Sequence, residues 1–243
     1  MQQHMPEEGQ GHIVYDPEWL SKATPEFFDP HHLSVQGMLS SFGSGRGTVW
    51  LFRHEGKEFA LRHYHRGGKV ARFLGDRYLW VGSNRSRPAR EVRILSQLAG
   101  QGLPVPSPVA WRVIRSGLMY RADLIVTRIS HARPLTQILR ERALEAAEWE
   151  GLGVLLRRFH DFQVWHADLN LSNILLRTPG DFFLIDFDRC RIRSGGLWKR
   201  RNLKRLHRSC LKEQAKSPEF HFREQDFETL LRGYARRASA TGS

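Results

Sequence analysis

The sequence is poor in cysteine, in acidic residues relative to basic ones, and in long apolar runs. Its two cysteines, Cys190 and Cys210, fit neither a metal-ligand spacing nor a disulfide framework, so we expect packed or free thiols. No apolar run approaches the roughly 20 residues that cross a bilayer. Residues 1–9 lack the basic and apolar regions of a signal peptide. These absences disfavour a disulfide-rich secreted domain and a membrane-spanning chain, and they predict a protein of the reducing cytoplasm.

Basic residues are abundant, with 38 Lys and Arg against 25 Asp and Glu and a formal net charge of +13. A surplus of this size predicts a partner of opposite sign, which could be nucleic acid, anionic lipid or a phosphorylated substrate. Composition alone does not choose among them. The 243 residues, 40 % of them apolar, suit one two-lobed globular unit.

Turn residues and apolar periodicity predict the order of elements. Residues 1–32 carry several prolines and are expected to form an irregular N-terminal arm. Five strands and one main helix are predicted next: strands Leu33–Ser41, Thr48–Arg53 and Lys57–Tyr64, helix Pro88–Ala99, and strands Val109–Arg115 and Leu118–Ile129. Helices Pro134–Arg142 and Ala143–Phe162 and strands Ile174–Leu176 and Phe182–Ile185 follow. The predicted class is α+β, a bilobal protein-kinase-like fold with a five-stranded N-lobe over 33–129 and a short, mostly helical C-lobe over 130–243.

The segment from His166 to Asn173 carries the pattern H-x-D-L-x-x-x-N, and Asp186-Phe187-Asp188 follows the last strand pair. In kinase-type phosphoryl transfer, one carboxylate lies beside the acceptor hydroxyl, while an Asn and a second Asp hold magnesium over the ATP phosphates. Asn173 comes five residues after Asp168, and Asp186 comes eighteen after it, which matches that order. The sequence therefore predicts a kinase that uses ATP and Mg2+, with Asp168, Asn173 and Asp186 as its catalytic residues.

Each residue of this motif has a simpler interpretation. Most loop aspartates cap turns, but the register with His166 and Asn173 favours Asp168 as the carboxylate that accepts the substrate hydroxyl's hydrogen bond. Asn173 and Asp186 are the predicted metal ligands, because magnesium prefers hard oxygen donors. His166 is expected to be a packed scaffold residue that holds the loop.

Gly43, Gly45 and Gly47 lie between the first two predicted strands, where a loop could cover the ATP phosphates. Glycines let backbone N–H groups approach phosphates without a Cβ in the way. The last glycine comes one residue earlier than in G-x-G-x-x-G, and glycine-rich hairpins are common. Their place ahead of the third strand favours a nucleotide-binding role.

The third strand carries Phe59-Ala60-Leu61-Arg62 where protein kinases have V-A-I-K. Arg62 would then contact the α- and β-phosphates, and Glu91, 29 positions later on the predicted helix, would be its ion-pair partner. Arg offers a planar fork where Lys offers a compact charge. A solvated arginine without nucleotide contact is the alternative. Asn170 is a second departure, because many protein kinases place a lysine two residues after the catalytic Asp.

These residues together resemble the lipopolysaccharide-core sugar kinases, in particular those that phosphorylate 3-deoxy-D-manno-octulosonic acid (Kdo). The likeness covers about residues 33–235 and is carried by four segments: residues 61–68 (L-R-H-Y-H-R-G-G), the catalytic loop, residues 185–189 (I-D-F-D-R) and residues 198–203 (W-K-R-R-N-L). The resemblance implies transfer of the γ-phosphate of ATP to the 4-hydroxyl of Kdo on a lipid A precursor. It also implies peripheral attachment to the cytoplasmic face of the inner membrane, and it makes Arg62 a trait of the family.

A basic amphipathic helix is predicted over residues 197–212. Helical spacing puts five basic residues on one face, Arg201, Lys204, Arg205, Arg208 and Lys212. The apolar face would carry Leu203, Leu206, Cys210 and Leu211, with Trp198 off it. Such a helix could bind an anionic membrane surface. It could equally pack its leucines in the C-lobe and leave its charges in water.

Three other functions compete with a Kdo kinase. A phosphotransferase for a soluble aminoglycoside or choline would need an acidic pocket, which the net charge disfavours. A protein kinase is disfavoured by the missing A-P-E segment and by Asn170. A non-enzymatic module that binds RNA or membrane is disfavoured by the retention of Asp168, Asn173 and Asp186, and nucleic acid is not an expected partner.

Overall fold

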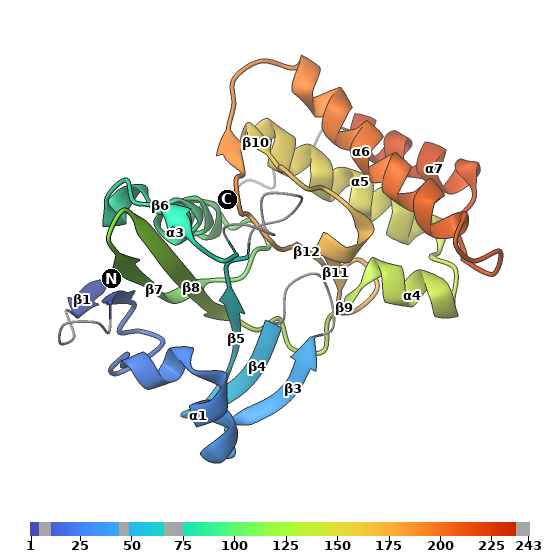
Figure 1. The fold of residues 1–243 in the computed structure, drawn as a ribbon. Helices are drawn as coiled ribbons and strands as arrows, with labels where there is room; N and C mark the ends of the chain where they lie inside the picture. The colour runs from blue at the N-terminus through green and yellow to red at the C-terminus, as the bar shows by residue number, and fades with distance from the viewer. Residues whose placement is uncertain (5–10, 44–48, 66–74, 237–243) are drawn as a thin grey trace, which may run out of the picture. The chain divides into compact units, whose positions relative to one another are not determined.

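The computed structural model describes residues 1–4, 11–43, 49–65 and 75–236 (Figure 1). It is a mixed α+β protein with antiparallel sheets. The chain divides into two compact units, residues 1–96 with 106–128, and residues 97–105 with 129–243. The first unit contains one large sheet and the second contains two small ones, and each unit carries part of the predicted functional residues.

The first unit is built on an eight-stranded sheet with the order β1-β2-β7-β8-β5-β4-β3, in which β6 also pairs with β8. The strands are β1 Gln2–His4, β2 His12–Tyr15, β3 Leu39–Gly43, β4 Val49–His54, β5 Lys57–His63, β6 Tyr78–Leu79, β7 Pro108–Ser116 and β8 Met119–Thr127. The five predicted strands are present as β3, β4, β5, β7 and β8. The predicted count was nevertheless wrong, because β1, β2 and β6 extend the sheet.

The irregular N-terminal arm was also a wrong prediction. Strand β2 pairs with β7, and the buried Ile13 and Phe28 join the core beneath the sheet. The short helices η1 (Pro25–Phe28) and α1 (Pro30–Val35) each begin with a proline, and α1 includes Leu33, which was predicted to start a strand. Proline suits the first turn of a helix, where its missing N–H is not needed, so these prolines start helices here.

Helix α3 (Arg87–Gly100) agrees with the predicted helix to within one residue at each end. Ala89 and Val92 of this helix pack with Trp111, Ala122 and other residues on one face of the sheet. The opposite face is covered by the N-terminal segment, where Leu33 packs with the cluster that contains Phe52 and Phe59. The sheet therefore has two buried faces, and β5 is held in its interior between β8 and β4.

The β4–β5 hairpin turns at the predicted place. Glu55 and Gly56 both have positive φ, 49° and 73°, as a tight two-residue hairpin requires. The pairing of Val49 with Arg62 sets the register of β5. The turn and register together determine where Arg62 projects.

The second unit is mainly helical, with α4 (Leu135–Glu141), α5 (Ala146–Asp161), α6 (Leu197–Gln214) and α7 (Glu224–Ala235). Two glycines bring α5 and α7 together: a Cβ on Gly153 would lie 2.0 Å from the carbonyl oxygen of Leu230, and a Cβ on Gly233 would lie 2.1 Å from that of Glu150. No side chain fits at either position, so the two helix backbones pack directly. No helix among the described residues is long and apolar enough to cross a membrane.

Short strands frame the predicted catalytic segment of this unit, residues 166–173. Strands β10 (Val164–Trp165) and β13 (Arg191–Ile192) pair with each other, and β11 (Ile174–Leu176) pairs with both β9 (Arg133–Pro134) and β12 (Phe182–Leu184). In the β11–β12 hairpin, Ile174 lies opposite Leu184. Residues 166–173 therefore run from the end of β10 to the start of β11, and Asp186 follows the end of β12.

Candidate functional site

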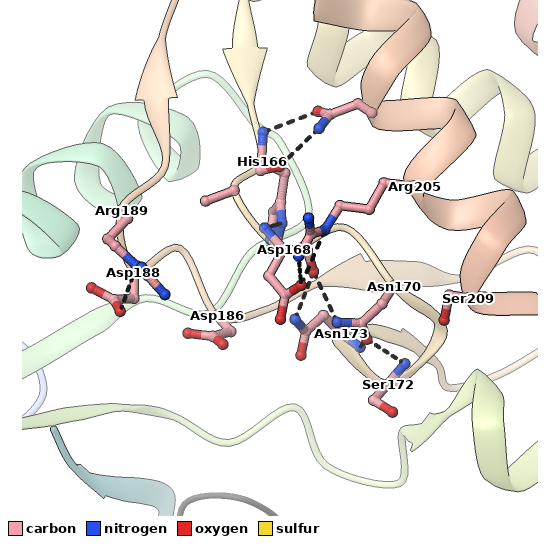
Figure 2. Close-up of polar contacts among 12 residues, drawn as sticks. His166, Asp168, Asn170, Ser172, Asn173, Asp186, Asp188, Arg189, Arg205 and Ser209 are labelled. Atoms are coloured by element: carbon pink, nitrogen blue, oxygen red, sulfur yellow. Dashed lines mark hydrogen bonds and ion pairs between the residues drawn. The ribbon is translucent and has the colours of Figure 1, made fainter. Parts of the chain in front are cut away.

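The catalytic segment is held in a tight turn by Asn170 (Figure 2). Its side-chain oxygen accepts hydrogen bonds from the backbone N–H groups of Ser172, at 2.9 Å, and Asn173, at 3.2 Å. Its amide nitrogen donates to the carbonyl oxygen of Asp168 at 3.0 Å. Asn170 caps the single 3-10 turn η3 (Leu171–Asn173) in the way that Asx side chains commonly do.

His166 is the buried anchor of this segment and is 2 % exposed. Its Nδ1 accepts from the backbone N–H of Asp168 at 3.3 Å, so its Nε2 donates to the carbonyl oxygen of Ile185 at 3.0 Å. Asn202 also accepts from the backbone N–H of His166 and donates to its carbonyl. Burial lowers the pKa of His166, so the ring is neutral near pH 7. These contacts agree with the predicted scaffold role.

Asp168 is half exposed, with 52 % of its side chain accessible. Nε and Nη2 of Arg205 both donate to its Oδ1, at 3.1 and 2.5 Å. Partial burial raises the pKa of Asp168, but the hydrogen bonds and positive charge of Arg205 outweigh burial, and the pKa lies below its usual value. The carboxylate is therefore ionised near neutral pH and can accept a hydrogen bond from a substrate hydroxyl.

Asn173 and Asp186 lie at the same end of the β11–β12 hairpin. The side-chain nitrogen of Asn173 donates to the carbonyl of Asp168 at 2.9 Å, which leaves its oxygen as the atom suited to a metal. Its backbone oxygen accepts from the N–H of Ile185 at 3.0 Å, so Asn173 lies opposite the residue before Asp186.

Asp186 has a positive φ of 62°, which aspartate tolerates better than most residues. Hard oxygen donors of this kind fit a magnesium site, which commonly uses one or two protein ligands. The described residues contain no cluster of three or more His, Cys, Asp or Glu side chains suited to a metal. A two-ligand site does not require such a cluster.

Arg62 and Glu91 form the predicted ion pair within the first unit, at 2.5 Å between Nη2 and Oε2. Glu91, on α3, is 3 % exposed, while the Arg62 side chain is 23 % exposed. The hydroxyl of Tyr64 donates to the same Oε2 at 2.6 Å, and the Arg62 guanidinium lies 5.0 Å from the Tyr64 ring centre. Burial raises the pKa of Tyr64 well above its usual value, so its hydroxyl stays protonated. Strand β5 and helix α3 thus fix the orientation of the Arg62 guanidinium.

The predicted glycine loop is only partly described. Gly43 ends β3 and pairs with Val49 at the start of β4. Gly45 and Gly47 lie outside the described residues, as do Thr48 of the predicted second strand and Arg66-Gly67-Gly68 of the signature. In the first unit the structure thus brings Arg62 and Glu91 together. In the second unit it brings Asn173 into contact with Asp168 and with the backbone of the residue before Asp186.

Helix α6 contributes residues whose role at this site was missed from the sequence. Arg205 was assigned to the exposed basic face, yet it contacts Asp168. Asn202 is buried, and a polar residue among the apolar positions of a helix was the available signal. Leu203, Leu206 and Cys210 are buried, which agrees with the alternative in which this helix packs its apolar face. Leu211 was assigned to the same apolar face but is 37 % exposed. Trp198 is buried, and its ring packs edge-on against His160.

The chain is similar to known proteins over most of its length. Residues 32–234 match the lipopolysaccharide kinase (Kdo/WaaP) family. A 3-deoxy-D-manno-octulosonic acid kinase of Photobacterium profundum is 42 % identical over 222 residues, which cover 91 % of this chain and 94 % of the relative. Proteins of the same name from Vibrio vulnificus and Actinobacillus succinogenes are 38 % and 39 % identical, and each alignment covers 93 % of this chain and at least 95 % of the relative.

The match spans every predicted functional position, from Gly43 to Asp186, as well as α6. The resemblance inferred from the catalytic loop and the R-H-Y-x-R-G-G and D-F-D-R segments is therefore confirmed at the level of the family. The chain belongs to the lipopolysaccharide kinase (Kdo/WaaP) family of phosphotransferases.

Proposed function

We propose that this chain transfers the γ-phosphate of ATP to the 4-hydroxyl of Kdo on a lipid A precursor, in assembly of the lipopolysaccharide core. Membership of a kinase family implies the use of ATP. The relatives named as 3-deoxy-D-manno-octulosonic acid kinases extend over nine-tenths of the chain, and this likeness supports the choice of sugar. The observation that carries the chemistry is the ionised Asp168 carboxylate, fixed beside Asn173 in a capped turn.

Asp168 would accept a hydrogen bond from the acceptor hydroxyl, direct its oxygen toward the γ-phosphate and take the proton late in the transfer. Two features prepare it for this role. Its backbone carbonyl oxygen accepts hydrogen bonds from the side-chain nitrogens of Asn170 and Asn173, which fix the main chain. Arg205 contacts only Oδ1, so Oδ2 is the oxygen that it leaves to other partners.

The first unit would supply the groups that hold the nucleotide, as an N-lobe over 33–129. Arg62 would contact the α- and β-phosphates, with its guanidinium oriented by Glu91 and Tyr64. Gly43, Gly45 and Gly47 would cover the phosphates with backbone N–H groups. Because phosphoryl transfer depends mainly on positioning and charge stabilisation, an arginine held in this way suits the task.

The second unit would supply the catalytic groups, as a C-lobe over 130–243. Asn173 Oδ1 and the Asp186 carboxylate would hold Mg2+, with the remaining ligands from phosphates and water. Magnesium, when bound, neutralises phosphate charge and so favours attack by the hydroxyl. The positive φ of Asp186 and the burial of Phe187 beside it fix the direction in which this carboxylate projects.

Mass spectrometry of the lipid product tests this function. Purified protein with ATP and Mg2+ should add one phosphate to Kdo-lipid A precursor, and fragmentation should locate it on Kdo. A lipid A precursor without Kdo and an aminoglycoside serve as control acceptors and should stay unmodified. Phosphate found only on the aminoglycoside, or on the precursor without Kdo, would contradict the proposal.

The basic face of α6 would hold the protein against the inner membrane surface. Arg201, Lys204 and Arg208 are exposed, and each basic residue near an anionic bilayer contributes on the order of 1 kcal/mol. Replacing these three by Gln should weaken sedimentation with phosphatidylglycerol vesicles in a salt-dependent way. Arg205 is left intact because it contacts Asp168. Equal binding by parent and variant would remove this face as an anchor.

A further inference from the structure

One side of α6 contacts the catalytic segment at three successive points. Asn202, Arg205 and Ser209 are three and four residues apart, a spacing that places them on one side of a helix. Asn202 bonds to the backbone of His166, Arg205 to the carboxylate of Asp168, and Ser209 Oγ accepts from the backbone N–H of Leu171 at 3.3 Å. The three residues meet the segment in the order of its sequence, so the helix lies along it (Figure 2).

We propose that Arg205 is the positioning residue for the catalytic carboxylate, and that it supplies from α6 the cation that many kinases carry as a lysine two residues after that Asp. This inference rests on the proposed role of Asp168 in phosphoryl transfer. The guanidinium holds Oδ1, turns the other oxygen toward the acceptor hydroxyl and keeps positive charge beside the reacting groups.

The residue at position 170 explains why the cation comes from another element. Asn170 uses its side-chain oxygen to cap the backbone of Ser172 and Asn173, and its nitrogen to bond the carbonyl of Asp168. A lysine has no acceptor oxygen and cannot make this cap. A segment folded around Asn170 therefore needs its positive charge from elsewhere, and Arg205 has the reach.

Arg205 differs from the other basic residues on its helix. Arg201, Lys204 and Arg208 are exposed, and no ion pair of theirs is found within the described ranges. Arg205 instead donates twice to one oxygen, between two further contacts of α6 with the same segment. Two N–H groups on one carboxylate oxygen form a charge-assisted contact of defined geometry. The contact is therefore part of the site, whereas the neighbouring charges face solvent.

Kinetics of Arg205→Ala test the inference against Arg200→Ala, a matched change at an exposed arginine of the same helix. Loss of Arg205 should lower kcat by roughly 10- to 100-fold, through lost orientation of the base, while the KM for ATP changes by less than about threefold. Arg205→Lys should recover part of the loss, and added guanidinium should partly rescue Arg205→Ala. Arg200→Ala should behave as the parent.

A double-mutant cycle with Asp168 distinguishes positioning from a structural role. In an Asp168→Asn background, Arg205→Ala should have little further effect, because the two residues act as a unit. Thermal unfolding of each variant checks that the fold is retained.

Two results would overturn the inference. One is an Arg205→Ala enzyme with kcat within about twofold of the parent. The other is a loss of activity that is equally large in the Asp168→Asn background and shows no recovery by lysine or guanidinium, which would make the contact structural only. The slow hydrolysis of ATP without lipid is measured in parallel for the parent, Arg205→Ala and Arg200→Ala. Because this reaction does not depend on the acceptor, it distinguishes a wrong acceptor from a wrong role for Arg205.

Discussion

Two arginine–carboxylate pairs, one in each unit, have the same shortest distance and different surroundings. Arg62–Glu91 and Arg205–Asp168 both close to 2.5 Å. The carboxylate of the first pair is 3 % exposed, whereas that of the second is 52 % exposed. In the first pair the arginine is the group proposed to reach the substrate, and the acid holds it. In the second pair the acid is proposed to reach the substrate, and the arginine holds it.

Burial distinguishes the two proposed roles. A buried charge without its partner is costly, so Glu91 is fixed by Arg62 and Tyr64 together and contributes to folding. An exposed ion pair contributes little to folding, about 0–1 kcal/mol. Asp168 can therefore exchange partners during the proposed reaction at low cost, while Arg205 holds the pKa of its carboxyl below the usual value.

The largest effect is expected at Asp168, the accessible acid. Asp168→Asn keeps the shape but cannot take a proton, so kcat should fall by roughly 10²- to 10⁴-fold. ATP affinity, measured by calorimetry, should change little, and the free energy of unfolding should change by less than about 1 kcal/mol. A variant with more than a tenth of the parent's turnover would end the assignment of Asp168 as base.

A smaller effect is expected at Arg62, the arginine of the buried pair. Arg62→Ala should raise the KM for ATP and lower kcat, reducing kcat/KM by about 10- to 100-fold, because phosphate positioning supports the transfer. Arg62→Lys keeps the charge and serves as the matched control. It should retain more activity than the alanine variant, although it lacks the planar fork.

Steady-state kinetics over a range of ATP concentrations separate the effect of Arg62→Ala on the KM for ATP from its effect on kcat. Unchanged KM and kcat in Arg62→Ala would mean that the nucleotide is held by other groups. The role of Arg62 would then be limited to its contact with Glu91.

The smallest effect on activity, and the clearest on stability, is expected at Glu91. Glu91→Gln removes the charge from a buried site whose partners are Arg62 and Tyr64. The free energy of unfolding should fall by about 1–3 kcal/mol, the usual range for a hydrogen bond to a charged group. Urea unfolding measures it, and Asp168→Asn is the control at the exposed pair. An equal fall in the free energy of unfolding in both variants would contradict the expected difference between the buried and the exposed pair.

The sequence by itself determined the order of most elements from β4 to β12 and the spacing of the predicted catalytic motif. Strands β4 and β5 follow from apolar residues on both sides of a tight turn, and α3 from its apolar spacing. The Arg62–Glu91 pair was predicted because these elements match the kinase pattern of a third-strand cation and a helix glutamate. The proximity of Asn173 and Asp186 follows in the same way from the β11–β12 hairpin. The register of this hairpin is local, so the pattern of residues contains it.

Only the tertiary structure decided which residues from distant segments complete the two units. Strand β2 joins β7 across about a hundred residues of sequence, and Arg205 reaches Asp168 from 37 positions away. In a sequence, Arg205 is equivalent to Arg201 and Arg208, since all three are basic residues on an amphipathic helix. The rotation of α6, set by its buried Asn202, Leu206 and Cys210, turns Arg205 toward the carboxylate. The rotation of an isolated helix about its axis is not fixed, and only packing against the catalytic segment fixes that of α6.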